Sequence, residues 1–440
     1  MNLALLWHFH QPVYRRPRSR DYVLPWVNFH ATKNYYQMAR LAEETGFPCT
    51  YNFVPCLLEQ IEDYAQGTAL DPFQLALELP PDRLGPIEIE RLRKFVPDET
   101  HATPLQRRAM ESFFSPIDPL PADAAGMLHR QKEIHRGLIP LWKRLSDERR
   151  VELTVSPYYH PLLPMIFDAA TAGAESPPGV AFRHPGDGHA QIRAGREYFR
   201  SVFGRDPKGI WPSEGGVSRD TAAAIAEAGF AFAVTDENIL WKSLGCYDRR
   251  ALYKPHRAED LTVFFRDREL SDLIGFEYQR WDAKDAVADL LRRLDERRPD
   301  CDEDSLVVLA LDGENPWGTF PQNGLPFLRE LYARLGSHPG VTPMFFEDYL
   351  ARYTSPSREI RLAPGTWLGS FSKWSGSPVK NRGWEILARA RKACGPVEEI
   401  LIAEGSDWFW WFGEEQTEEF AFLFELYISE AYRRAGLARA

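Results

Sequence analysis

The chain lacks a cysteine framework. It has five cysteines in 440 residues, and no two of them are spaced as C-x-x-C. An odd count without that spacing argues against a disulfide-stapled fold and against a zinc site built from thiolates. Thiols in a chain of this length are typical of a reducing compartment, so we expect a cytoplasmic protein.

Long apolar runs are also missing. The N-terminal run LALLW has only five apolar residues before His8, and no basic segment precedes it. A secretory signal needs a longer apolar core, and a membrane helix needs about 20 apolar residues. We therefore expect neither a signal peptide nor a membrane as partner.

Positive charge is in deficit. The chain has 53 Lys and Arg against 63 Asp and Glu, which gives a net charge of −10 at pH 7. A protein that binds nucleic acid needs a basic face, and no Lys/Arg run with interleaved aromatic residues occurs, so nucleic acid is not an expected partner. The hydrophobic content of 44% and charged content of 26% describe an ordinary globular protein.

Short apolar runs predict the secondary structure. Helical patterns such as AGREYFRSVFG (194–204) separate most of them, and each run is apolar on both faces, which indicates a parallel sheet covered by helices. About seven such strands favour a closed or nearly closed β/α barrel. The predicted strands are 3–9, 49–55, 151–156, 209–213, 230–235, 261–267 and 306–312.

Two regions break this alternation. Residues from about 60 to 148 are charged and helical, and they predict a helical insertion after the second strand. From about 355 onward we find amphipathic helical patterns and no convincing strand. The sequence therefore predicts a catalytic barrel over residues 1–355 and a helical domain over 356–440.

Polar side chains follow at least five of the predicted strands, at the strand ends where chemistry gathers in a parallel barrel. Each has a plain structural explanation, such as a helix cap for a carboxylate or a turn for Asp312 before Gly313. Together they are harder to explain that way, because isolated buried polar groups are costly without partners. The candidates are His8, His10, Gln11, Tyr158, His160, Glu214, Asp272 and Asp312.

Glu214 and Asp312 come from different strands and lie 98 residues apart in the chain. A pair of carboxyl groups on the two sides of a glycosidic bond is the usual equipment for cleaving that bond. Aromatic residues near them, Tyr158, Trp211 and Trp317, offer flat faces for sugar rings and an apolar setting that raises the pKa of an acid.

A metal-dependent amidohydrolase or deacetylase is the main rival. His8, His10, His160 and Asp312 match the ligand layout of such enzymes. Glu214 would then have no role, and only one convincing histidine follows a later strand, so we expect no metal. A non-catalytic glucan-binding protein on the same scaffold is a third possibility.

Five motifs, in order HFHQP, SPYYHPLLPM, GIWPSEGGVS, FFRDRELSDLIGF and LALDGENPW, resemble the signature regions of glycoside hydrolase family 57. The likeness is to its α-amylase and amylopullulanase branch, and WEILARARKA and EGSDWFWWFGEEQ resemble the family's helical region. The resemblance implies an α/β fold, an incomplete (β/α)7 TIM-like barrel followed by a helical bundle. It also implies retaining cleavage or transfer of α-1,4- and possibly α-1,6-glucosidic bonds in glucans or maltooligosaccharides, without a cofactor.

The resemblance also implies residue roles. Glu214 matches the nucleophile, Asp312 the general acid/base, and His10 a substrate contact with His8 beside it, while His160 matches the central subsite. Trp211, Asp272 and Trp317 match positions near the sugar. The segment GTWLGSFSKWSGSP (365–378) departs from the apolar run expected there, which leaves the acceptor side open. Hydrolysis and 4-α-glucanotransfer therefore remain alternatives. The sequence does not determine the oligomeric state.

Overall fold

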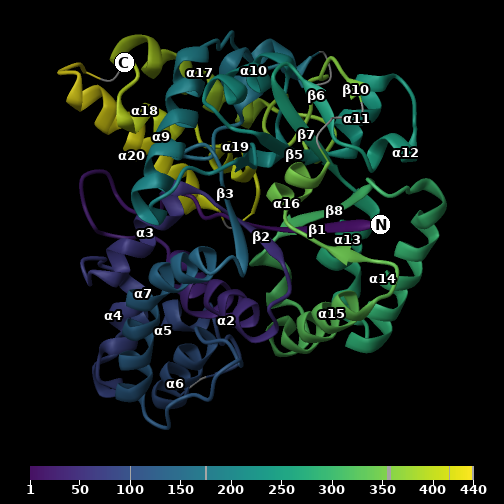
Figure 1. The fold of residues 1–440 in the computed structure, drawn as a ribbon. Helices are drawn as coiled ribbons and strands as arrows, with labels where there is room; N and C mark the ends of the chain where they lie inside the picture. Colours follow the sequence, from purple (N-terminus) through teal and green to yellow (C-terminus); the bar gives the residue numbers. More distant parts are fainter. Residues whose placement is uncertain (100, 174–175, 354–357, 416, 439–440) are drawn as a thin grey trace.

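The computed structural model describes residues 1–440 except 100, 174–175, 354–357, 416 and 439–440. All seven predicted strands are present, and the fold is α/β with a largely parallel sheet, as predicted (Figure 1). The strands are β1 (Asn2–Phe9), β2 (Cys49–Phe53), β3 (Val151–Val155), β4 (Gly209–Ile210), β5 (Phe232–Asp236), β7 (Leu261–Arg266) and β8 (Leu306–Asp312). Consecutive strands from β1 to β5 pair in parallel, β7 pairs in parallel with β5, and β8 pairs in parallel with β1.

The sheet has the strand order β10-β6-β7-β5-β4-β3-β2-β1-β8. Strands β7 and β8 have no ladder between them, but the backbone N–H of Asp267 donates to the carbonyl of Val308 at 2.8 Å. Three short strands lie outside the prediction: β6 (His256–Ala258), antiparallel to β7, β9 (Thr342–Pro343), beside β1, and β10 (Arg358–Glu359), beside β6.

Alternate residues of β1 pack on opposite sides of the sheet. Leu3, Leu5 and Trp7 pack in the larger apolar core with the surrounding helices. Ala4 and Leu6 pack in a second cluster with Phe232, Phe264 and Val308 from β5, β7 and β8. Because strand side chains alternate, His8 continues the row of Ala4 and Leu6, at the carboxyl end of the strand.

Helices cover the outer side of the sheet (Figure 1). The stretch 60–148 is helical where it is described, and Figure 1 places its α4 to α6 at one end of the molecule. Its helices are α3 (Pro55–Ala65), α4 (Pro72–Glu78), α5 (Pro86–Arg93), α6 (Ala102–Ser112) and α7 (Ala124–Asp147). The other helices before residue 354 are α1 (Trp26–His30), α2 (Tyr36–Thr45), α8 (Leu163–Phe167), α9 (Pro185–Phe203), α10 (Arg219–Glu227), α11 (Glu237–Leu244), α12 (Arg249–Leu252), α13 (Arg268–Asp272), α14 (Ala283–Arg297), α15 (Leu325–Ser337) and α16 (Phe346–Arg352).

The C-terminal part is helical, except that β10 contradicts our expectation of no strand beyond about 355. Its helices are α17 (Pro378–Cys394), α18 (Glu398–Ala403), α19 (Ser406–Trp411) and α20 (Glu418–Arg434). The start of α19 joins the loop after β3, because the backbone N–H of Ser406 donates to the carbonyl of His160 at 2.9 Å. This contact brings residues far along the chain to the carboxyl ends of the strands.

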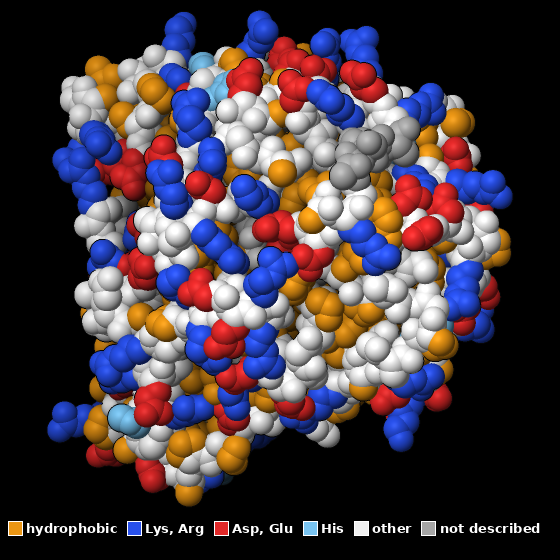
Figure 2. Space-filling model, viewed as in Figure 1, with side chains coloured by type: hydrophobic (Ala, Val, Ile, Leu, Met, Phe, Trp, Pro, Cys, Tyr) orange, Lys and Arg blue, Asp and Glu red, His pale blue; other side chains and the backbone are white. Residues whose placement is uncertain are grey.

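No helix in the described part of the chain is long and apolar enough to span a membrane. On the face that Figure 2 shows, basic and acidic side chains are interspersed, and neither sign forms a continuous field.

Candidate active site

A cavity of about 600 Å³ opens at the carboxyl ends of the strands. It brings together six residues that the sequence selected, from β1, from β8 and from the segments after β3, β4 and β7. These are His8, His10, His160, Glu214, Asp272 and Asp312. The two predicted catalytic carboxyl groups therefore face one shared space, although they come from distant parts of the chain.

Glu214 sits on a sharp turn after β4. Its φ is +59° and that of Gly215 is +58°, so two successive residues have left-handed backbone conformations. Such a conformation is uncommon for a residue with a side chain and persists only where the surrounding contacts hold it. The turn is held from two sides: the N–H of Trp367 donates to the Glu214 carbonyl at 3.0 Å, and the hydroxyl of Thr235 donates to the Gly215 carbonyl at 2.5 Å.

Both oxygens of the Glu214 carboxyl group accept hydrogen bonds. The Ser406 hydroxyl lies 2.8 Å from Oε1, and the indole Nε1–H of Trp367 donates to Oε2 at 3.1 Å. The pKa of Glu214 is raised to about 8: burial is the largest cause, the negative charges of Asp407 and Asp312 add to the rise, and the two donors oppose it.

Asp312 is the last residue of β8, and it lies opposite His8 in the parallel pairing of β1 with β8. Asn315 donates its Nδ2–H to Oδ2 of Asp312 at 2.8 Å. Burial raises the pKa of Asp312, and the contact with Asn315 and the charges of His10 and Arg266 oppose that rise.

The pKa of Glu214 and the hydrogen bonds point to different protonation states. A pKa of about 8 places a proton on Glu214 at neutral pH, whereas a nucleophile must be ionised. The hydrogen bonds favour the ionised form, because an indole N–H can only donate and the Ser406 hydroxyl can donate to the other oxygen. Both oxygens of Glu214 are therefore placed as acceptors, which is the arrangement that its ionised form needs.

Three histidines line the same cavity. The rings of His10 and His160 are stacked, with centroids 3.8 Å apart and planes at 21°, and the His8 ring lies 5.2 Å from that of His160. Burial lowers the pKa of His8 to about 3 and that of His160 well below its usual range, so both rings are neutral at physiological pH. Neutral imidazoles offer one donor and one acceptor each, which suits sugar hydroxyl groups.

Asp407, at the start of α19, is a site residue that our sequence analysis did not select. Its two carboxylate oxygens lie 2.9 and 2.8 Å from Nε2 of His10. Ser406 and Trp367 were not predicted either; they lie in the segments EGSDWFWWFGEEQ and GTWLGSFSKWSGSP. The resemblance of the first segment was the only available signal, because neither segment follows a predicted strand.

Glu314 and Arg266 complete the walls of the cavity. Glu314 is buried, and its Oε1 accepts from the backbone N–H of His10 at 3.0 Å, so it holds the loop after β1 in place. Arg266 pairs with Asp236 at 2.7 Å and with Asp272 at 3.2 Å, and it stacks on the ring of Trp367. The predicted residue Asp272 is therefore tied to a buried guanidinium at the edge of the cavity.

Two of the predicted sugar contacts, Trp211 and Trp317, do not line the cavity. Both are fully buried. The ring of Trp211 packs against Trp367 and His8, each with a centroid distance of 5.7 Å. Trp317 donates its indole N–H to the carbonyl of Gly313 at 2.7 Å, which fixes the loop after Asp312. They support residues that line the cavity.

Gln11 and Tyr158 also lie outside the lining. Gln11 is buried, accepts from the hydroxyl of Tyr14 at 2.9 Å and donates to Glu314 at 3.5 Å. Tyr158 is half-buried, and its hydroxyl donates to Glu59 at 3.4 Å. Gln11 thus positions Glu314, while Tyr158 packs against the rings of Tyr159 and Tyr198.

The geometry does not favour the metal alternative. His8 directs Nδ1 at Asn52, 2.7 Å away, and Asp312 is absent from the one group of potential ligands in the described residues, which consists of His10, His160 and Asp407. The lone pairs of an imidazole lie in the plane of its ring. The stacked rings of His10 and His160 therefore cannot both direct a lone pair at the same tetrahedrally coordinated zinc ion.

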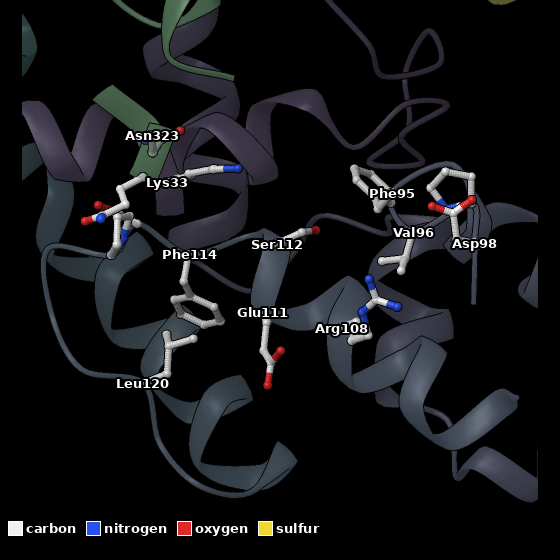
Figure 3. Close-up of a pocket in the computed structure, with 14 residues that line it drawn as sticks. Lys33, Phe95, Val96, Asp98, Arg108, Glu111, Ser112, Phe114, Leu120 and Asn323 are labelled. Atoms are coloured by element: carbon white, nitrogen blue, oxygen red, sulfur yellow. The ribbon is translucent and has the colours of Figure 1, made fainter. Parts of the chain in front are cut away.

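A second hollow, of about 520 Å³, lies between the helical insertion and the loop at residues 322–323 (Figure 3). Lys33, Arg108, Glu111 and Phe114 are among its lining residues. None of the residues selected from the sequence lines it, so the chemistry that they suggest belongs to the first cavity.

Two carboxyl groups and several hydrogen-bonding side chains around one cavity, at the carboxyl ends of parallel strands, are typical of the glycoside hydrolase class. A family model for glycosyl hydrolase family 57 matches residues 4–361. The chain therefore belongs to glycosyl hydrolase family 57, as the motifs predicted.

Solved structures show the same fold at low sequence identity. A family 57 branching enzyme from Thermococcus kodakaraensis is 18% identical with a TM-score of 0.65, covering 98% of this chain and 89% of its own. The α-amylase AmyC from Thermotoga maritima is 16% identical with a TM-score of 0.65, covering 98% and 93%. A 4-α-glucanotransferase from Thermococcus litoralis is 19% identical with a TM-score of 0.62, covering 99% and 60%. No curated protein sequence matches the chain.

Proposed function

We propose that the protein is a retaining enzyme that cleaves or transfers α-glucosidic bonds in α-1,4-glucans or maltooligosaccharides. The observation that carries this proposal is the placement of Glu214 and Asp312 on one cavity, with both oxygens of Glu214 accepting hydrogen bonds. The family, and the names of the similar structures, a branching enzyme, an α-amylase and a 4-α-glucanotransferase, support the α-glucan substrate.

The first step forms a covalent intermediate. A carboxylate oxygen of Glu214 attacks the anomeric carbon as the bond from that carbon to the glycosidic oxygen breaks, which gives a β-glucosyl ester. Asp312 donates its proton to the departing oxygen and is left as a carboxylate. His10 and His160 hydrogen-bond sugar hydroxyl groups.

The second step regenerates the enzyme. Asp312 removes a proton from an acceptor hydroxyl, whose oxygen attacks the anomeric carbon and releases Glu214 as a carboxylate. Two inversions at one carbon restore the α-configuration. Water as acceptor gives hydrolysis, and the 4-hydroxyl of a second glucan gives 4-α-glucanotransfer.

Transfer is a second candidate because the rim of the cavity is apolar. Phe276 is 66% exposed and Leu368 is 46% exposed, and Trp410 and Trp411 are half-buried lining residues. Apolar and aromatic side chains at the entrance disfavour bound water and provide faces on which sugar rings stack. A glucan acceptor fits such a rim better than water does.

The product profile on maltoheptaose tests both candidates. Products that are all shorter than the substrate indicate hydrolysis, and products both longer and shorter indicate transfer. Intact maltoheptaose after long incubation, with pullulan and glycogen also unchanged, would contradict the proposed function.

A further inference from the structure

We propose that Ser406 is a positioning residue that couples the protonation state of Glu214 to the tautomer of His160. This inference rests on the proposed function of Glu214 as nucleophile. Ser406 is 1% exposed and is not among the residues that line the cavity, so it acts through its neighbours.

The contacts form a chain of three groups. The Ser406 hydroxyl oxygen lies 2.8 Å from Oε1 of Glu214 and 3.0 Å from Nδ1 of His160. Glu214 Oε1 and His160 Nδ1 are themselves 3.8 Å apart, too far for a hydrogen bond. Ser406 therefore bridges two groups that do not otherwise interact through a proton.

A hydroxyl group has a single proton, and this fact allows two arrangements. When Glu214 is ionised, Ser406 donates to it, and Nδ1–H of His160 donates to Ser406. When Glu214 is protonated, it donates to Ser406, and Ser406 donates to a bare Nδ1 of His160. A neutral imidazole has one N–H, so His160 carries that proton on Nε2 in the second arrangement.

The two arrangements differ in whether Nε2 of His160 carries a proton. This atom is buried and has no hydrogen-bond partner in the described structure, while the ring itself lines the cavity. With Glu214 ionised this atom has a lone pair, and with Glu214 protonated it has an N–H. A hydrogen-bond donor that reaches Nε2 would therefore stabilise the ionised form of Glu214.

The proton balance closes along this chain. A proton that arrives at Nε2 of His160 releases the Nδ1 proton to Ser406, and Ser406 passes its own proton to Oε1 of Glu214. No oxidant or second reactant is needed. The backbone supports the arrangement, because the N–H of Ser406 donates to the His160 carbonyl at 2.9 Å and His160 has a left-handed φ of +55°.

Two variants should move the pKa of Glu214 in opposite directions. Ser406→Ala removes the donor to the carboxylate. We expect the acidic limb of the pH profile of kcat/KM to move to higher pH by about 1–2 units. His160→Asn keeps an N–H near the place of Nδ1 and accepts the left-handed backbone well, so it holds Ser406 in the donating arrangement. We expect its acidic limb to move down.

The second readout does not depend on turnover. A water-soluble carbodiimide with an amine labels protonated carboxyl groups, and mass spectrometry of the Glu214 peptide gives the pH at which labelling is half-lost. That midpoint should rise in Ser406→Ala and fall in His160→Asn. Ser406→Thr, which keeps the hydroxyl, should return it toward the wild-type value.

Ser375→Ala is the matched control. Ser375 is a buried serine in the C-terminal part whose hydroxyl donates to the backbone carbonyl of Ser176 at 2.9 Å, so it tests the loss of a buried hydroxyl without contact to Glu214. If Ser406→Ala does not fold, Ser406→Cys keeps the shape with a weaker donor and should show part of the upward shift.

A loss of kcat in Ser406→Ala with unchanged limb and unchanged labelling midpoint would overturn the inference and leave the proposed function intact. If the wild-type protein acts on no α-glucan, the proposed function fails, and the labelling midpoints still decide whether Ser406 couples the two groups. Shifts of the same sign in Ser406→Ala and His160→Asn would also contradict the coupling.

Discussion

Glu152 and Glu214 are two buried glutamates on the same sheet with very different surroundings. Burial raises the pKa of Glu152 to about 7 and that of Glu214 to about 8. Glu152 lies in β3, where the hydroxyl of Thr50 and the backbone N–H groups of Phe346 and Glu347 donate to it. It therefore caps the start of α16, and a helix N-terminus favours a nearby carboxylate.

Glu214 differs in what its carboxyl group faces. It borders a cavity together with Asp312, and its donors are the side chains of Ser406 and Trp367. Glu152 is not among the residues of that cavity. A raised pKa alone thus does not identify a catalytic group, because structural carboxyl groups share it. The open cavity with a second carboxyl group makes the distinction.

The largest expected effect separates these two glutamates directly. Glu214→Gln keeps the shape but removes the nucleophile, and we expect kcat on maltooligosaccharides to fall by about 10⁴-fold or more while binding survives. Glu152→Gln should keep kcat within about threefold and lower the free energy of unfolding by about 1–3 kcal/mol. Steady-state kinetics and denaturant unfolding of both variants measure the contrast. Equal losses of activity would mean that the comparison is wrong.

A smaller effect is expected at the second carboxyl group of the cavity. Asp312→Asn removes the proton donor, and we expect turnover of maltooligosaccharides to fall by about 10²–10⁴-fold. A substrate whose leaving group needs no proton, such as an α-glucosyl fluoride, should lose much less in the first step. Comparing the two substrates in wild type and variant provides the check. An equal loss on both substrates would contradict the role of Asp312 as acid.

The smallest expected effect is on how the melting temperature depends on pH. The pKa of Glu214 is raised in the folded protein, so the folded state binds its proton more tightly, and this stability is lost as pH rises from about 4.5 to about 8. Glu214→Gln has no such loss. Its melting temperature should therefore exceed that of wild type by about 1–4 °C at pH 9 and match it near pH 4. Scanning calorimetry across this range tests the sign, and a variant less stable than wild type at pH 9 would be the opposite result.

Much of the fold could be predicted from sequence because buried parallel strands are continuous apolar runs. All seven predicted strands are present. The short strands β6, β9 and β10 were missed, since their residues (HRA, TP and RE) form no apolar run. Six of the ten predicted site residues line the cavity. Trp211 and Trp317 belong to the same motifs as Glu214 and Asp312, but their large apolar rings pack into the interior and leave the cavity to their neighbours.

By itself, the sequence determined seven of the strands, the family and the two carboxyl groups that follow strands. These depend on local patterns, namely apolar runs and the polar residues that directly follow them. Only the tertiary structure decided which groups meet around the cavity. Ser406 reaches Glu214 across 192 residues, and Asp407 reaches His10 across 397. Nothing in a local pattern encodes such contacts, because they arise only when the C-terminal helices pack against the carboxyl ends of the strands.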